Sequence, residues 1–181
     1  MPELSTEKGR NCRNKIEKGR KFLNLKIRRT RMKKVHHFQT ARFDTLSERR
    51  WQQALGINKL TMINPPWFPE ELTDMGANYF RTSGVDVVCA ESARGLATDQ
   101  LSVTPEKVFE WVRSNVPDST ECVFLGGGGL RAISVIAALE EDLSKPVITA
   151  NQIAFWHAIR LAGVKESIDG YGEIFDHQLP V

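Results

Sequence analysis

Four short apolar runs alternate with helical patterns between residues 51 and 175, and this alternation restricts the possible folds more than any other feature. The runs are compact, as buried strands are, and cover residues 59–64, 85–90, 121–125 and 146–150. Helical spacing or capping residues follow each run, over 70–81, from 104 onward, over 130–143 and over 151–163. The pattern predicts an α/β domain with a parallel sheet flanked by helices.

Four consecutive glycines, Gly126–Gly129, stand between the third predicted strand and its helix. Glycine lets a ligand approach the backbone closely, and the free N–H groups and helix dipole of such a turn favour an anion. A Rossmann fingerprint would need glycine at position 131, where the chain has Arg131, and the GK[ST] ending of a phosphate loop is absent. The turn therefore predicts a site for a carboxylate, an enolate or a phosphate. A tight turn that only packs helix on strand is the alternative.

Other candidate residues follow the remaining strands, because ligands of open parallel sheets bind beyond the carboxyl ends of the strands. Trp67, in the turn after the first strand, could wall a pocket or only cover the core edge. Thr149, Asn151 and Gln152 offer neutral hydrogen bonds after the fourth strand, although helix capping would also explain Asn151. Cys89 could supply a thiol, but a free cysteine is more often a small core residue.

The charge of the chain is divided sharply at about residue 50. Residues 1–50 carry 16 Lys/Arg and 5 Asp/Glu, whereas residues 51–181 carry 9 and 17. We expect residues 1–50 to be a basic, disordered extension. A nucleic-acid arm is a weaker alternative, because no aromatic residues interleave with KIRRTRMKK (26–34). An organelle-targeting segment is weaker still, since Glu3, Glu7 and Glu17 interrupt it.

The sequence gives no sign of a membrane protein or a metal centre. No apolar run approaches the roughly 18 residues of a membrane span, and no secretory signal is evident. The three cysteines are widely spaced, form no CxxC pair and suggest neither a zinc site nor a disulfide framework. No acidic residue or cysteine completes a ligand set with His36 and His37. We expect a cytoplasmic protein without a bound metal.

One stretch resembles a known family closely. VFLGGGGLRAISVIAALEEDLSKPVITANQIAFWHAIRLAGV, residues 123–164, is similar to the C-terminal part of the arylmalonate decarboxylase and maleate cis-trans isomerase group. This group belongs to the Asp/Glu racemase superfamily. GYGEIF (170–175) resembles the closing segment of arylmalonate decarboxylase, and weaker similarity reaches upstream through INPPWF (63–68) to about Trp51.

The resemblance implies two similar α/β halves that face each other across a cleft, with a cysteine that exchanges a proton with the substrate. Residues 51–181 would then be an incomplete domain of this type, a half-domain with a returning C-terminal helix. Backbone amides and hydroxyls would hold the substrate carboxylate and the enediolate that forms from it. We expect Gly127, Gly128, Gly129, Trp67, Thr149 and Asn151 to contact the substrate.

Two departures from the family bear on catalysis. The family's C-terminal cysteine aligns with Gly127, so this chain has no thiol there and its catalytic residue stays unknown. Residues 1–50 look nothing like the family's N-terminal half, which carries the first active-site turn.

These departures leave three hypotheses open. The first is a cofactor-independent decarboxylase or isomerase for small mono- or dicarboxylic acids. A half-domain leaves its cleft face uncovered, so we expect a homodimer or an aggregation-prone monomer. The second is a truncated homologue that keeps the fold without catalysis. The third is a binding module with a basic nucleic-acid arm, for which the sequence offers the least support.

Overall fold

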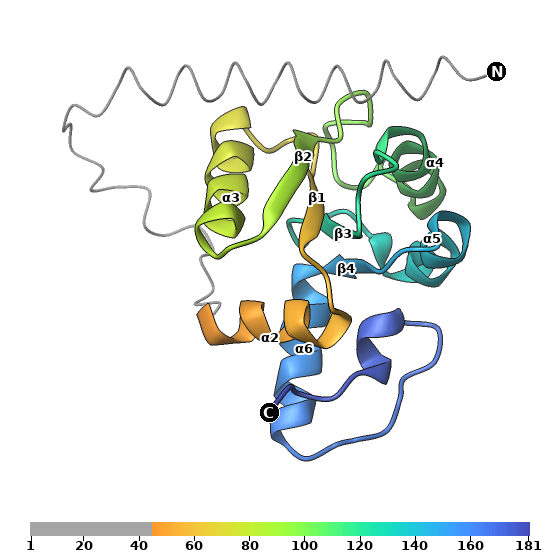
Figure 1. Ribbon diagram of the computed structural model, residues 1–181. Coiled ribbons are helices and arrows are strands. Elements are labelled where there is room, and N and C mark those ends of the chain that lie inside the picture. Colours follow the sequence, from red (N-terminus) through yellow and green to blue (C-terminus); the bar gives the residue numbers. More distant parts are fainter. Residues whose placement is uncertain (1–44) are drawn as a thin grey trace.

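The computed structural model describes residues 45–181 (Figure 1). Most of the basic segment, including KIRRTRMKK and the His36–His37 pair, lies outside the described residues. Helix α2 (Thr45–Leu55) begins upstream of the boundary predicted at Trp51. It belongs to the folded part because Trp51 and Gln52 are buried and because α2 packs against the helix that follows the last strand.

A four-stranded parallel sheet forms the centre of the structure, as the alternation predicts. Its strands are β1 (Lys59–Asn64), β2 (Asp86–Ser92), β3 (Cys122–Leu125) and β4 (Val147–Thr149), in the order β2-β1-β3-β4. The chain passes from β1 outward to β2, then crosses to β3 on the other side of β1. Strand β2 runs beyond its predicted end at Ala90, because pairing with β1 continues to the Asn64–Ser92 pair.

Helices cover both faces of this sheet. They are α2, α3 (Glu70–Thr82), α4 (Pro105–Asn115), α5 (Ile136–Leu143) and α6 (Ala150–Leu161), with two short 3-10 helices, η1 (Ala132–Val135) and η2 (Glu173–Asp176). Figure 1 shows α4 and α5 together on one side of the sheet, α3 on the other side, and α2 and α6 overlapping below it. Among residues 45–181, no helix combines the length and apolarity needed to span a membrane.

Strand alternation divides the core into two layers. Leu60 and Met62 of β1 point into a layer formed with α2, α3, α6 and η2. Ile63 of the same strand points into the other layer, formed with α4 and α5. Successive side chains of a strand face opposite ways, so one buried strand serves both layers. The apolar runs of the sequence follow from this double burial.

The predicted α-helix over 130–143 is wrong for residues 130–135. Arg131 adopts a left-handed conformation (φ 46°, ψ 32°), and the chain then forms the 3-10 helix η1 before α5 begins at Ile136. A 3-10 helix turns every three residues rather than every 3.6. As a result Ile133, which the α-helical spacing places inward, is 44% exposed.

The N-terminal capping residue predicted from the sequence is confirmed at α4 and is wrong at α6. Thr104 caps α4, with Pro105 in the first helical turn, as expected. At α6 the cap is Thr149 rather than Asn151. The Thr149 hydroxyl accepts a hydrogen bond from the Gln152 N–H (3.2 Å), and the Gln152 side chain accepts one from the Thr149 N–H (2.8 Å). This reciprocal capping box satisfies two backbone donors and leaves the Asn151 side chain exposed.

The C-terminal tail folds back along α6 and is held by one buried arginine. Arg160 is 6% exposed. Its guanidinium donates hydrogen bonds to the carbonyl oxygens of His177 (2.9 Å), Val164 (2.8 Å), Glu166 (3.1 Å) and Phe175. The indole N–H of Trp156 also donates to the His177 carbonyl (2.9 Å).

Replacing this arginine should loosen the tail. Arg160→Met removes the shared donor of four carbonyls, and buried acceptors without partners cost free energy. We expect the free energy of unfolding to fall by about 2–3 kcal/mol, measured by urea denaturation. Arg113→Met is the control, because Arg113 forms an exposed ion pair with Asp142 (3.1 Å) and should cost less than about 1 kcal/mol. If both variants lost the same free energy of unfolding, the proposed role of Arg160 in holding the tail would be contradicted.

Candidate functional site

A hollow of about 440 Å³ lies beyond the carboxyl ends of β3 and β4. The glycine turn, η1, the first turns of α6 and the C-terminal tail surround it. This is the edge at which a parallel sheet is expected to bind ligands. The lining residues are Leu125, Gly127, Gly128, Leu130, Arg131, Ala132, Ile133, Thr149, Asn151, Gln152, Phe155, Tyr171 and Phe175.

The first glycine of the turn is required by a close approach to the end of β1. A Cβ at Gly126 would lie 2.0 Å from the Oδ1 atom of Asn64. The Gly126 N–H donates to the Ile63 carbonyl (2.8 Å), which continues the β1–β3 ladder into the turn. Both observations fix the turn against β1 and thereby set the position of the residues that follow.

The second glycine is required by its conformation and by its neighbours. Gly127 has φ +70°, a region that favours glycine. A Cβ there would lie 2.7 Å from Cγ of Pro65 and 3.1 Å from the Phe68 ring. The position that aligns with the family cysteine is therefore shaped for a residue without a side chain.

The last two glycines face different neighbours. Gly128 is exposed, and a Cβ there would meet only Nδ2 of Asn151, at 3.6 Å. Gly129 turns away from the hollow, toward the Trp67 ring (2.7 Å from a Cβ) and the Gln100 amide (3.1 Å). Of the six residues predicted to contact substrate, Gly127, Gly128, Thr149 and Asn151 line the hollow, whereas Gly129 and Trp67 cover each other beside it.

A buried polar chain supports the turn after β1, and the sequence did not reveal it. The Asn64 amide donates to the Thr73 hydroxyl (3.0 Å), which shares a hydrogen bond with the Ser92 hydroxyl (3.1 Å). Ser92 also donates to the Phe68 carbonyl (3.4 Å). All three side chains are buried. Buried polar groups need such partners. These hydrogen bonds join β1, α3 and β2 behind the glycine turn.

The helix dipole at the hollow belongs to α6, not to the helix that follows the glycine turn. The glycine turn leads into η1, and α5 begins only at Ile136, so the expected alignment of the turn with a helix axis is absent there. The twelve-residue α6 begins at Ala150, beside Thr149 and Asn151 of the hollow. Its N-terminal partial positive charge therefore faces the hollow.

Large apolar and aromatic side chains form much of the rim of the hollow, which is open to solvent. Phe155 is 55% exposed, Tyr171 48% and Ile133 44%. The Phe155 ring meets the Phe175 ring edge to face at 6.1 Å. Sequence reasoning missed Phe155 and Tyr171, because α6 and the closing GYG segment meet only in the tertiary structure. Cys89 lies in β2 at 1% exposure and is not among the described residues that line the hollow.

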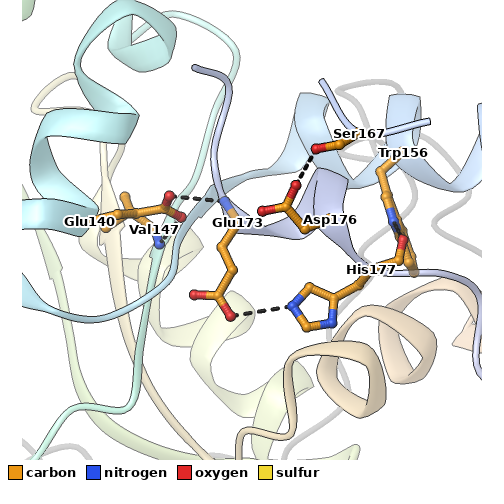
Figure 2. Close-up of polar contacts among 7 residues, drawn as sticks. All are labelled: Glu140, Val147, Trp156, Ser167, Glu173, Asp176 and His177. Carbon is orange, nitrogen blue, oxygen red and sulfur yellow. Dashed lines mark hydrogen bonds and ion pairs between the residues drawn. The ribbon is translucent and has the colours of Figure 1, made fainter. Parts of the chain in front are cut away.

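Gln152 and Glu140 hold the tail that carries Tyr171. The Gln152 amide donates to the Tyr171 carbonyl. The Glu140 carboxylate accepts from the backbone N–H groups of Val147 and Glu173, both at 2.9 Å (Figure 2). Gly172 fits between them, because a Cβ there would lie 2.9 Å from Ile136 and 3.3 Å from Glu140. A single carboxylate from within α5 thus joins that helix to the start of β4 and to the tail.

Burial raises the pKa of Glu140, although the two N–H donors act in the opposite direction. Two further acidic groups of the tail, Glu173 and Asp176, also raise it. Across residues 45–181, no cluster of three or more His, Cys, Asp or Glu side chains is arranged to bind a metal.

Comparison with known proteins identifies a family. The model of the arylmalonate decarboxylase family matches residues 45–175. An arylmalonate decarboxylase from Bordetella bronchiseptica is 39% identical over 61 residues, which are 33% of this chain and 25% of that protein.

Solved structures share the fold. A maleate isomerase variant from Pseudomonas putida S16, determined with maleate, is 20% identical with a TM-score of 0.63 and is matched over 73% of this chain and 52% of its own. An arylmalonate decarboxylase variant in the sulfate ion associated form is 21% identical (TM-score 0.62; 72% and 57%). The maleate cis-trans isomerase of Nocardia farcinica is 15% identical (TM-score 0.62; 73% and 53%). The chain therefore spans about half the length of these structures, and the predicted fold class and family resemblance are confirmed.

The tight contact at Gly126 should make this glycine irreplaceable. Gly126→Ala places a Cβ 2.0 Å from Asn64 Oδ1, and we expect a loss of about 1–3 kcal/mol in the free energy of unfolding. Gly128→Ala is the matched control, because its Cβ would meet an ordinary contact at 3.6 Å. Urea denaturation of both variants distinguishes them. Equal stabilities would show that the turn does not depend on Gly126.

The raised pKa of Glu140 predicts a pH-dependent effect of Glu140→Gln. Above the ordinary value of 4.5, the folded state binds more protons than the unfolded state, so this group's contribution to stability falls as the pH rises through the raised pKa. The variant lacks this loss. Its stability relative to wild type should therefore rise by about 0.5 kcal/mol between about pH 4 and pH 7, a small figure because solvent screens the half-buried carboxylate.

Denaturation midpoints across this pH range test the Glu140 prediction. Glu141→Gln removes the same charge from an exposed position of α5, and the difference between the two variants isolates the buried carboxyl. A difference that is flat or falls with pH would overturn the assignment.

Proposed function

We propose, since this chain belongs to the arylmalonate decarboxylase family, that it binds a small carboxylic acid in the hollow beyond β3 and β4. The reaction it would serve is a decarboxylation or an isomerisation that passes through an enediolate-type intermediate without an organic cofactor or metal. The observation that carries this proposal is that the glycine turn and the start of α6 line one small space.

The site has the groups that an anion needs. Gly127 and Gly128 border the hollow with no side chain to block their backbone. The Asn151 side chain is exposed beside Gly128, and the α6 N-terminus adds a partial positive charge. Among family relatives, one maleate isomerase is described with maleate and one arylmalonate decarboxylase with a sulfate ion. We infer that in this chain the hollow beyond β3 and β4 holds a substrate carboxylate.

The same donors would also stabilise the intermediate. When a carbon–carbon bond to a departing CO₂ breaks, its electron pair moves into the enediolate, and negative charge grows on the oxygen atoms. Fixed N–H donors lower the energy of that charge without reorganising. The carbanionic carbon then takes one proton to give the product. The acid that delivers this proton is unassigned in this chain.

Gly127 sets the second candidate function. This chain has glycine at the position where the family resemblance places a cysteine. Pro65 and Phe68 would crowd any side chain there. This geometry favours, as the alternative, a non-catalytic relative that binds small acids and keeps the fold.

Binding and turnover separate the two candidates. We expect maleate or phenylmalonate to bind the purified chain in calorimetry. Gly128→Val should weaken binding at least about ten-fold, roughly 1.4 kcal/mol, because its side chain would occupy the space beside Asn151. Ala138→Val is the control, an enlargement at an exposed position of α5 that does not line the hollow.

Turnover is then followed as CO₂ release from phenylmalonate and as cis–trans conversion of maleate by NMR. Turnover would support the enzyme, and binding without turnover would support the alternative. If neither maleate nor phenylmalonate binds, the proposed site is contradicted.

A further inference from the structure

Arg131 holds a backbone conformation that its side chain disfavours, at the mouth of the hollow. Its φ is 46°, and only Ser144 shares a positive φ among the other non-glycine residues of 45–181. Left-handed backbone is costly for residues other than glycine, and asparagine tolerates it better than arginine does. Strained residues of this kind cluster at ligand-binding sites, where the surrounding structure fixes them.

The Arg131 side chain has no evident role in holding the fold together. It is exposed, and within the described part of the chain its guanidinium forms no hydrogen bond or ion pair. Its charge acts weakly on the carboxyl of Glu106, at the start of α4. The pKa of Glu106 is lowered by the Thr104 hydroxyl first and only lastly by Arg131, so the two charges interact at a distance. The guanidinium therefore keeps its hydrogen-bonding capacity for a ligand.

Arg131 is also the charged residue of an otherwise neutral hollow. The other lining side chains that can hydrogen-bond are Thr149, Asn151, Gln152 and Tyr171, and the rest of the lining is apolar or glycine. A carboxylate at the glycine turn and the α6 start would leave a second anionic group near Arg131. A planar guanidinium binds a carboxylate through two parallel hydrogen bonds.

We propose that Arg131 selects dianionic acids, by pairing with the second carboxylate of a short dicarboxylate whose first carboxylate lies at Gly127 and Gly128. This inference rests on the proposed function and assigns a specificity-determining residue to its site. Monoanionic acids of the same size would use only the glycine side of the hollow. Arg131 thus determines specificity, whereas the glycine turn provides affinity for any carboxylate.

The test compares maleate with isocrotonate, in which a methyl group stands where maleate has its second carboxylate. Calorimetry on the wild-type chain should give at least a ten-fold preference for maleate. Arg131→Asn keeps a residue that tolerates the left-handed backbone but removes the charge. It should weaken maleate binding about ten-fold and leave isocrotonate within two-fold. Arg131→Lys should fall between, because it keeps the charge without the planar fork.

Two controls make the result decisive. Arg113→Asn removes an exposed arginine that pairs with Asp142 away from the hollow, and it should leave both affinities unchanged. Thermal melting should show Arg131→Asn and Arg131→Gly at least as stable as wild type, since both relieve backbone strain.

The outcomes separate this inference from the proposed function. If both acids bind wild type and Arg131→Asn weakens them equally or not at all, the role of Arg131 is overturned while the carboxylate site stands. If neither acid binds wild type, the proposed site itself fails, and the role of Arg131 fails with it.

Discussion

The contact between the glycine turn and the end of β1 determines the geometry of everything around the hollow. Gly126 can lie against the Asn64 side chain only because it has no Cβ, which would be 2.0 Å from Oδ1. Asn64 is in turn fixed through Thr73 and Ser92, so α3, β1 and β2 set its position. The turn that presents backbone donors is thereby anchored to the rigid centre of the sheet, and a bound anion would meet groups that are already in place.

The other side of the hollow is built by the C-terminal tail, which the core holds with polar contacts. Arg160 gathers four carbonyls of residues 164–177, Gln152 holds Tyr171, and Glu140 joins the tail to β4. These contacts bring Tyr171 to the hollow that Phe155 also lines, although the two come from different segments. The resulting hollow has a mostly apolar lining with a few polar side chains, a combination typical of small-ligand sites.

Membership of the family favours catalysis, whereas the glycine at position 127 argues against it. The fold and the backbone donors suit a carboxylate and an enediolate, whereas the cysteine position has a positive φ and crowding neighbours. Substrate binding and proton transfer are thus separable properties here. In this chain the first is supported by the geometry of the hollow, and the second requires a group that the glycine turn does not contain.

The sequence alone determined the α/β class, all four strands and the glycine turn, because burial on both faces and the need for residues without Cβ atoms leave local patterns. It also indicated Thr149 and Asn151 beside that turn. Only the tertiary structure decided that Thr149 caps α6, that a 3-10 helix follows Arg131, and that Trp67 covers Gly129 instead of facing the hollow. The tertiary structure also revealed that Arg131, Phe155 and Tyr171 line the same hollow. The reason is physical: a cap, a left-handed residue and a pocket wall depend on which distant segments approach, and periodicity records only which residues are buried.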